Sequence, residues 1–326
     1  MSIFRFAGLV TAGLLSAAPL MAADYTIRLA NSLSPGEPTN EAAAFFAEEV
    51  AKRTDGRVEI QVFPAQQLGS EKDVNQMMRQ GAPMISVTSS GYLSDFVPDI
   101  GVLEGPYLLD EPEQFNKLVE SEWFGGIQSA FDEVGITFLV DNALFGGRNI
   151  LANEPVRSPA DIEGMTVRVP PNTVFIETFE AMGARPTTVE WAEVYSALQQ
   201  NVVEAAEAPL GSLWGSKLYE TRDTISMTNH FTAFTFWVIN ADYFASLPED
   251  IQEVMLEVGA EAGALCTELT LERDEAYKAQ FRDAGITIVE DVDIAAFREQ
   301  TAGVYDAFPD WTPGLYTTIR GILDAE

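Results

Sequence analysis

Basic residues are scarce in this sequence. Its 326 residues include 19 Lys and Arg against 50 Asp and Glu, which gives a formal net charge of −31 at pH 7. Proteins that bind nucleic acid present a basic face to the phosphate backbone, whereas a strongly negative surface repels both that backbone and anionic membranes. We therefore exclude nucleic acid as a partner.

Histidine and cysteine are scarcer still, with one of each, His230 and Cys266. A zinc site made of His and Cys ligands and an intramolecular disulfide are excluded, and a Cys-His dyad has a single pairing without a supporting motif. The sequence also lacks G-x-S-x-G, P-loop and H-E-x-x-H motifs. We expect no catalytic residues, metal or cofactor, a hydrogen-bonded structural role for His230, and a buried position in a helix for Cys266.

The first 23 residues contain no acidic residue. They run from Met1 through Arg5 and an apolar stretch over 6–20 to Ala22 and Ala23, which is the pattern of a cleaved secretory signal peptide. The apolar stretch is too short to cross a bilayer, and no later stretch reaches the ~20 apolar residues that a spanning helix needs. We place a signal peptide at 1–23 and expect a soluble protein exported to a bacterial periplasm.

Strands and helices alternate along the rest of the chain. Hydrophobic residues make up 47% of the sequence, enough for a large core, and the length favours two domains. The pattern predicts an α/β fold with a largely parallel sheet in two similar halves, and a ligand cleft where the carboxyl ends of strands face each other. The expected strands are 25–29, 58–63, 84–87, 165–169 and 202–207, and the expected helices are 40–54, 71–80, 173–182 and 190–200.

A helical pattern runs from Pro248 to about Ala284 without an internal proline. A helix of ~36 residues would be ~54 Å long, which exceeds one small domain and could brace two. Gly263 is the expected bend or break in this helix. We place lobe I at residues 24–145 plus 234–270 and lobe II at residues 146–233 plus 271–326.

Two arginines lie on expected strands, Arg148 directly after two glycines and Arg168 within the strand 165–169. An arginine on a strand that is buried on both faces needs an anionic partner. The planar guanidinium suits a carboxylate, to which it donates two parallel hydrogen bonds. That carboxylate belongs either to a bound ligand or to one of the many Asp and Glu side chains, and spacing alone does not choose between them.

Several motifs, in this order along the chain, resemble the solute-binding proteins of TRAP (tripartite ATP-independent periplasmic) transporters. The resemblance covers nearly the whole chain after residue 23 and is thinnest after Ala284. The motifs are FPAQQLGSE at 63–71, GMTVRVP at 164–170, GARPT at 183–187, WAEVYSALQ at 191–199, VVEAAEAP at 202–209, KLYE at 217–220, TNH at 228–230 and LPEDIQ at 247–252.

This resemblance implies a two-lobed fold of the periplasmic-binding-protein (Venus flytrap) type, with crossing strands and a long helix bracing both lobes. It implies closure around a small organic acid and delivery of that acid to a membrane permease driven by an ion gradient. Arg168 matches the principal carboxylate-binding arginine, Arg148 a second arginine that assists, and Trp191 a side chain that packs on the ligand. Glu207 matches a glutamate beside the cleft, which either contacts ligand or orients an arginine.

The sequence departs from the family pattern in the motif at 202–209. Many members have Asp-Gly in place of Ala205 and Ala206, and several have an asparagine in place of Ala208 that can bond the ligand. This departure leaves open what supplies the polar half of specificity.

The opposite wall of the cleft is expected from residues that follow the strand 84–87. Ser89, Ser90 and Tyr92 could offer hydroxyls to a hydroxy acid or sugar acid, or they could form a plain surface turn. Glu71 and Asn31 are weaker candidates of the same kind.

Two other functions stay open. A binding protein for a sensor kinase or an ABC importer would use the same chemistry, and an exported enzyme acting on an acidic sugar is the third and weakest option. The bound acid could be a C4 dicarboxylate, a sugar acid or a 2-oxo acid. A monomer is the default for a subunit that shuttles between ligand and permease.

Overall fold

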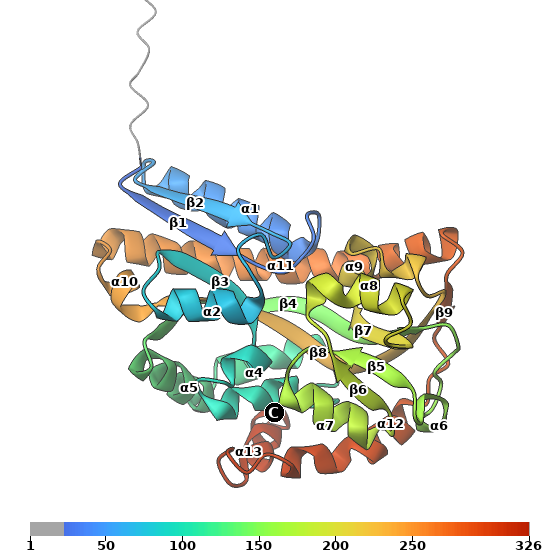
Figure 1. Cartoon of the computed structure of the whole chain (residues 1–326). Coiled ribbons are helices and arrows are strands. Elements are labelled where there is room, and N and C mark those ends of the chain that lie inside the picture. The colour runs from blue at the N-terminus through green and yellow to red at the C-terminus, as the bar shows by residue number, and fades with distance from the viewer. Residues whose placement is uncertain (1–22, 326) are drawn as a thin grey trace, which may run out of the picture.

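A computed structural model describes residues 23–325, so the expected signal peptide lies outside the described residues apart from Ala23. The described chain is organised around one sheet of nine strands, in the order β2-β1-β3-β8-β4-β7-β5-β6 with β9 paired to β8 (Figure 1). The predicted α/β architecture is confirmed. The strands are β1 (Tyr25–Ala30), β2 (Val58–Phe63), β3 (Met84–Ser89), β4 (Ile136–Ala152), β5 (Thr166–Val169), β6 (Arg185–Thr188), β7 (Ala205–Pro209), β8 (Thr224–Asn240) and β9 (Thr287–Val289).

The sheet is parallel within each half and antiparallel where the halves meet. β1 pairs in parallel with β2 and β3, and β5 pairs in parallel with β6 and β7. Between them, β8 runs antiparallel to β3 and β4, and β4 runs antiparallel to β7. The alternating pattern of the sequence predicts each parallel half, but it does not encode the direction of the two central strands, which depends on pairing between residues more than 50 positions apart.

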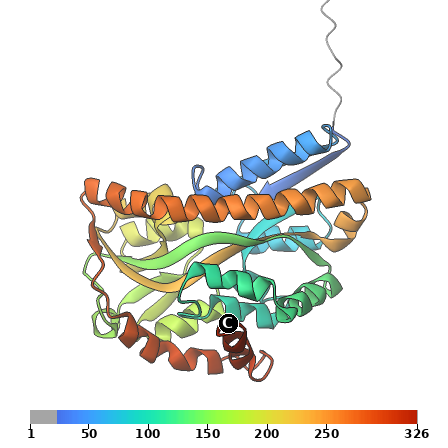
Figure 2. The same cartoon turned by 180° about the vertical axis from the view of Figure 1, so that it is seen from behind.

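Three long elements pass through both halves. β4 and β8 have 17 residues each, and α11 (Glu249–Asp283) has 35. Figure 2 shows α11 running across the whole width of the molecule, with β4 and β8 beneath it. At ~1.5 Å per residue the helix is ~53 Å long, and at ~3.3 Å per residue a strand of this size reaches up to ~56 Å. The expected bracing helix is therefore present.

Gly263 does not bend α11, contrary to expectation, because the helix is unbroken from Glu249 to Asp283. A Cβ at Gly263 would collide with the side chain of Asn142, and one at Gly259 would collide with the carbonyl oxygen of Leu139. Both glycines therefore let the backbone of α11 approach β4 closely. A glycine that serves close packing gives the same sequence signal as one that marks a break.

Helices cover both faces of the sheet, and none of those in the described residues is long and apolar enough to cross a bilayer. The α-helices besides α11 are α1 (Pro38–Arg53), α2 (Glu71–Arg79), α3 (Ser90–Leu93), α4 (Phe115–Val119), α5 (Glu122–Glu133), α6 (Pro159–Ile162), α7 (Thr173–Ala181), α8 (Val194–Gln199), α9 (Leu210–Gly215), α10 (Ala241–Ala245), α12 (Ile294–Thr301) and α13 (Leu315–Leu323). The 3₁₀-helices are η1 (Pro98–Glu104), η2 (Pro112–Gln114), η3 (Trp191–Glu193), η4 (Leu218–Glu220) and η5 (Ala302–Asp306).

The buried apolar side chains form a separate cluster on each face of each lobe. Along β8, Phe236 and Val238 enter one cluster of lobe I, while Trp237 and Ile239 enter the other. This alternation follows from the two-residue repeat of a strand. Each lobe therefore has its own core, although Val174 of lobe II enters the aromatic cluster of lobe I and Tyr107 enters a cluster of lobe II. The lobes are otherwise connected through the long elements and through side chains at the cleft.

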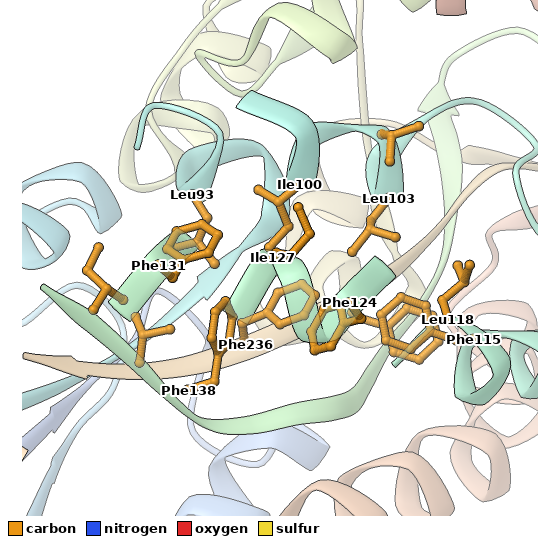
Figure 3. Close-up of a cluster of buried hydrophobic side chains, with 14 of the residues drawn as sticks. Leu93, Ile100, Leu103, Phe115, Leu118, Phe124, Ile127, Phe131, Phe138 and Phe236 are labelled. Atoms are coloured by element: carbon orange, nitrogen blue, oxygen red, sulfur yellow. The ribbon is translucent and has the colours of Figure 1, made fainter. Parts of the chain in front are cut away.

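An aromatic cluster in lobe I fixes the segment that leads to the cleft. Phe115, Phe124 and Phe236 lie in it beside Ile100 and Leu103 of η1, as Figure 3 shows. Burial of apolar side chains at this density stabilises a short helix that could not persist alone. The last residue of η1, Glu104, is thereby held at the edge of lobe I.

The end of the chain lies on lobe I, whereas the expected boundary assigned residues 271–326 to lobe II. α12 does join lobe II, where Phe297 is buried. The chain then returns, and Leu315, Ile319 and Leu323 of α13 enter the aromatic cluster of lobe I. Their four-residue spacing puts them on one face of the helix, but which core that face meets is a matter of tertiary packing.

We expect Gly259→Ala to destabilise the protein although alanine favours helix formation. The new methyl group would collide with the backbone at Leu139, so β4 or α11 must shift, at a cost of about 1–3 kcal/mol. Urea unfolding followed by circular dichroism measures the change.

Gly125→Ala in α5 is the matched control. Nothing lies within 4 Å of a Cβ at that position, so the substitution should stabilise the protein by about 0.5–1 kcal/mol through helix propensity. Equal midpoints for the two variants would show that Gly259 has no packing role.

Candidate ligand-binding site

A cavity of about 80 Å³ lies between the lobes. It lies at the carboxyl ends of β3, β5 and β7, where the sequence pattern placed the cleft. The lobe I wall comes from Ser32, Leu33, Gln66, Glu71, Val87, Thr88, Ser89 and Tyr92, and the facing wall from Phe145, Arg148, Arg168, Pro170, Phe175, Trp191, Ala208 and Ser212.

The guanidinium group of Arg168 is held in place, but only its Nε donates a hydrogen bond to another described residue. The residue is 2% exposed. Its Nε donates to the carbonyl oxygen of Val189 at 2.8 Å, and the guanidinium carbon lies 5.2 Å from the ring centre of Trp191. Among the described residues, no acceptor bonds to Nη1 or Nη2, and the nearest carboxylate oxygen, on Glu207, is 3.9 Å from Nη1. These two nitrogens can donate to a planar anion in the cavity.

Arg148 is already paired with a carboxylate. Its Nε and Nη2 donate to the two carboxylate oxygens of Glu207 at 2.6 and 2.7 Å, and Glu207 is fully buried. Burial alone would raise the pKa of Glu207, but the charge and hydrogen bonds of Arg148 hold it below its ordinary value. Glu207 does not line the cavity. Its place is that of a residue orienting an arginine, which is one of the two roles that the sequence left open.

His230 supports the same carboxylate from the other side. Its Nε2 lies 3.3 Å from Glu207, and its Nδ1 lies 2.8 Å from the hydroxyl of Thr228. Burial lowers the pKa of His230, so the ring is neutral near pH 7 and can donate to Glu207 while accepting from Thr228. The structural role expected for His230 agrees with this arrangement.

On the wall that carries the arginines, the charges therefore leave one positive charge without a partner. Arg148 and Glu207 neutralise each other, and His230 is neutral. Burial lowers the pKa of Arg168 to about 10, which still leaves it protonated near pH 7. A buried cation at 3.9 Å from an already paired carboxylate favours an incoming anion.

The lobe I wall offers polar groups opposite the arginines. Glu71 accepts hydrogen bonds through Oε1 from the hydroxyl of Thr88 and from the backbone nitrogen of Ser89, both at 2.7 Å. Burial raises the pKa of Glu71 to about 7. Ser89 and Tyr92 also line the cavity. Three of the five residues expected on this wall are thus brought to the cavity.

Asn31 and Ser90 lie elsewhere. The side chain of Asn31 is buried in a turn, where its oxygen accepts from the backbone nitrogen of Leu33 and its nitrogen donates to Asn40. This local bonding is typical of asparagine after a strand. Ser90 is 2% exposed, begins α3, and does not line the cavity.

Sequence reasoning missed several residues of the wall, chiefly Gln66, Phe145, Phe175 and Ser212. Gln66 lies within the motif at 63–71, Phe145 directly precedes the two glycines before Arg148, and Ser212 comes three residues after β7. Their nearness in sequence to strand ends or to recognised motifs is the one signal that could have found them.

Metal ligands do not gather at this site. Within residues 23–325, no group of three or more His, Cys, Asp or Glu side chains is placed to hold a metal ion. The chemistry available at the cavity is hydrogen bonding and ion pairing.

The sequence of residues 29–310 matches the family model of the bacterial extracellular solute-binding proteins, family 7 (DctP). The chain belongs to this family. The resemblance to TRAP solute-binding proteins is thereby confirmed, and the family consists of binding proteins. Among curated relatives, an uncharacterised protein of Sinorhizobium fredii is 33% identical over 87% of this chain. The match covers 52% of that relative, so the chain spans about half of its length.

Solved structures of TRAP periplasmic solute-binding proteins share the fold of this family 7 protein. One from Ochrobacterium anthropi, with bound L-fuconate, has 36% identity and a TM-score of 0.90, covering 93% of this chain and 100% of that one. One from Actinobacillus succinogenes, with bound L-galactonate, has 31% identity and a TM-score of 0.89, covering 91% and 99%. An apo open structure from Escherichia fergusonii has 29% identity and a lower TM-score of 0.81, covering 91% and 99%.

We expect Glu207→Gln to destabilise this family 7 protein strongly. The change leaves Arg148 as a buried charge without its counter-ion, which costs about 3–5 kcal/mol. Because the pKa of Glu207 lies below its ordinary value of 4.5, its contribution is present above that pH and is lost as the pH falls further. The difference between variant and wild type should therefore shrink below about pH 4. Urea unfolding at several pH values measures both effects.

Asp291→Asn removes the exposed partner of Arg157 and serves as the control. An exposed pair contributes about 0–1 kcal/mol, so this variant should stay close to wild type. If both variants shifted unfolding equally, the Arg148–Glu207 pair would not be the stabilising interaction described here.

Proposed function

We propose that this protein is the periplasmic solute-binding subunit of a TRAP transporter, which captures a small organic acid between its lobes and delivers it to the membrane permease. The observation that carries the proposal is Arg168, a buried guanidinium at the cavity whose two terminal nitrogens have no hydrogen-bond partner among the described residues. Family membership supports it.

The ligand carboxylate would take the place that Nη1 and Nη2 of Arg168 leave open. The bond from Nε to Val189 and the ring of Trp191 fix the plane of the guanidinium before ligand arrives. Little order then has to be gained on binding, and a charge-assisted bidentate pair is strong in a cavity that excludes water. The remaining nitrogen of Arg148, Nη1, can add one hydrogen bond to the same anion.

We further propose that the acid is a monocarboxylic hydroxy acid of the sugar-acid type. Of the described residues that line the cavity, two are basic, and Glu207 already neutralises one of them. A second ligand carboxylate would face Glu71 without a cation of its own, whereas ligand hydroxyls could donate to Glu71 and bond to Ser89 and Tyr92. Two of the similar structures contain such acids, L-fuconate and L-galactonate.

The described conformation supports closure as the mechanism of capture. Residues of both lobes line one cavity and Arg168 is almost fully covered. At nearly equal sequence identity, the fold is closer to the ligand-bound structure than to the apo open one, with TM-scores of 0.89 and 0.81. A ligand that contacts both walls binds the closed form alone, so it shifts the population towards that form.

The proposed setting is the periplasm, with the signal peptide at 1–23 as the export signal and the permease as the membrane partner. The protein would act as a monomer that meets the permease only in the closed, loaded form. Neither catalysis nor a cofactor enters this scheme.

A thermal-shift screen of the mature protein should single out sugar acids. A ligand that binds the native state raises its stability by RT ln(1 + [L]/Kd), about 2.7 kcal/mol at a hundredfold excess over Kd. L-fuconate, L-galactonate and D-glucuronate should raise Tm more than succinate or malate at equal concentration. A larger shift with succinate would contradict the proposed ligand class but not the capture of a carboxylate.

Calorimetry with the acid that gives the largest shift should then show a loss of affinity in Arg168→Ala. The loss should be about 2–5 kcal/mol, because the bound carboxylate loses its partner in a buried site. Arg168→Lys keeps the charge without the planar fork and should fall in between. Arg157→Ala, at an exposed arginine, is the control, and wild-type affinity in Arg168→Ala would overturn the mechanism.

A further inference from the structure

Outside the ligand cavity, buried polar contacts join the lobes at several places. Tyr107 bonds to the backbone oxygens of Thr228 and His230, and two further small sets lie one on each face of the sheet. The first joins η1, which packs on the aromatic cluster of lobe I, to the start of α7 in lobe II. The second joins the start of α1 in lobe I to α9 in lobe II. In Figure 1, α1 and α9 lie in the upper half of the view, and α7 lies in the lower half beside α4.

We propose that these contacts are two latches that hold the closed form from within the protein, separately from the ligand. Each latch is a buried glutamate of lobe I bonded to a polar side chain of lobe II, seated on a glycine. The first consists of Glu104, Asn172 and Gly91, and the second of Glu37, Ser212 and Gly215.

In the first latch, the side-chain amide of Asn172 bonds to both lobes. Its oxygen accepts from the backbone nitrogen of Val174 at 2.9 Å and caps α7, while its nitrogen donates to Glu104 at 2.8 Å. Glu104 is 4% and Asn172 6% exposed. The N-terminus of a lobe II helix is therefore tied directly to a lobe I carboxylate, in a place that solvent does not reach.

Gly91 makes the first latch possible. A Cβ at this position would overlap the amide of Asn172 and the carboxylate of Glu104. Gly91 has ordinary helical geometry without a positive φ, so its backbone could be that of alanine. The atom nearest to such a Cβ is the side-chain nitrogen of Asn172 in lobe II, and the next is a carboxylate oxygen of Glu104 in lobe I. The missing side chain therefore leaves room for lobe II when it closes, and also for the Glu104 side chain.

The second latch repeats this arrangement with the glycine on the other lobe. The carboxylate of Glu37 accepts from the hydroxyl of Ser212 at 2.6 Å and from the backbone nitrogen of Ser34 at 2.7 Å. A Cβ at Gly215 of lobe II would lie 2.9 Å from Cβ of Ser34 and 3.2 Å from Oε1 of Glu37. The approach is tighter than ordinary contact but looser than at Gly91.

Each latch can open again, because closing it removes water from its carboxylate and that desolvation costs free energy. Burial raises the pKa of Glu37 to about 7 and that of Glu104 to about 6. Opening would return both groups to solvent, which offsets part of the gain from the interlobe hydrogen bonds. Two such contacts can populate a closed form without making it permanent, which a protein that must release its ligand requires.

Ligand-free protein is the direct test, and it does not depend on the identity of the acid. Spin labels on Gln80→Cys of lobe I and Val202→Cys of lobe II, both at exposed positions, would report the distance between the lobes by pulsed electron paramagnetic resonance. The native Cys266 is buried and would not be labelled. With no acid added, we expect a short and a long distance in the labelled parent protein.

In Gly91→Ala, the ratio of closed to open molecules should fall about tenfold, so that the short distance becomes much rarer. This is the effect of losing one hydrogen bond to a charged group. Gly215→Ala should lower the ratio less, because the space there is larger. Gly125→Ala, at an open helical position, should leave it unchanged. Urea unfolding of the same variants measures how far the new methyl group also destabilises lobe I itself, since the Glu104 side chain would have to move away from it.

An unchanged distance distribution in Gly91→Ala would overturn the proposal, as would a parent protein with no short distance before acid is added. Neither result would touch the proposed function, which is tested by the affinity of Arg168→Ala. If Gly91→Ala opened the ligand-free protein while no acid bound the wild type, the latches would stand and the ligand assignment would fail.

Discussion

The interaction on which the site depends is the buried bidentate pair of Arg148 and Glu207. Buried charge is expensive unless it is paired, and this pair, with neutral His230 behind it, places two oppositely charged side chains deep in the protein at low net cost. Arg168 lies beside the pair without a counter-ion of its own. One positive charge on this wall of the cleft therefore remains without a partner, and an anion from solution can pair with it. Removing one member of the pair would leave the other as a buried charge without its partner.

The charged pair lies where the two lobes are joined. Arg148 lies on β4 between Glu207 on β7 and His230 on β8, so the pair sits where the two long strands cross from one half of the sheet to the other. Irregularities in the β4–β8 register near Arg148 allow the strands to bend there. α11 spans both lobes on one side and limits how they can move. In the proposed mechanism, a carboxylate binds at this junction, contacts both walls of the cleft, and the lobes close over it.

Much of this could be read from the sequence. The alternating strands and helices of each half, the long helix, and the cleft at the ends of strands followed from periodicity and from general rules for open sheets. Arg168, Arg148 and Trp191 were found because motifs of known order surround them. Asn31 and Ser90 were misplaced, because a polar residue after a strand bonds its own turn as readily as it faces a cleft. Gly263 was misread, because close packing and chain breaking use the same residue.

The sequence by itself determined the family and the two-lobed architecture, and its motifs made Arg168 the candidate for binding an anion, since these depend on local patterns and on residues whose chemistry allows few roles. Tertiary structure alone decided the direction of the central strands, the return of α13 to lobe I, the pairing of Glu207 with Arg148 rather than with ligand, and the contacts of Gly91 with Asn172 and Glu104. Each of these joins segments that are far apart in the chain. The free energy of such contacts depends on burial and on distances between atoms, and neither is written in the spacing of residues along one strand or helix.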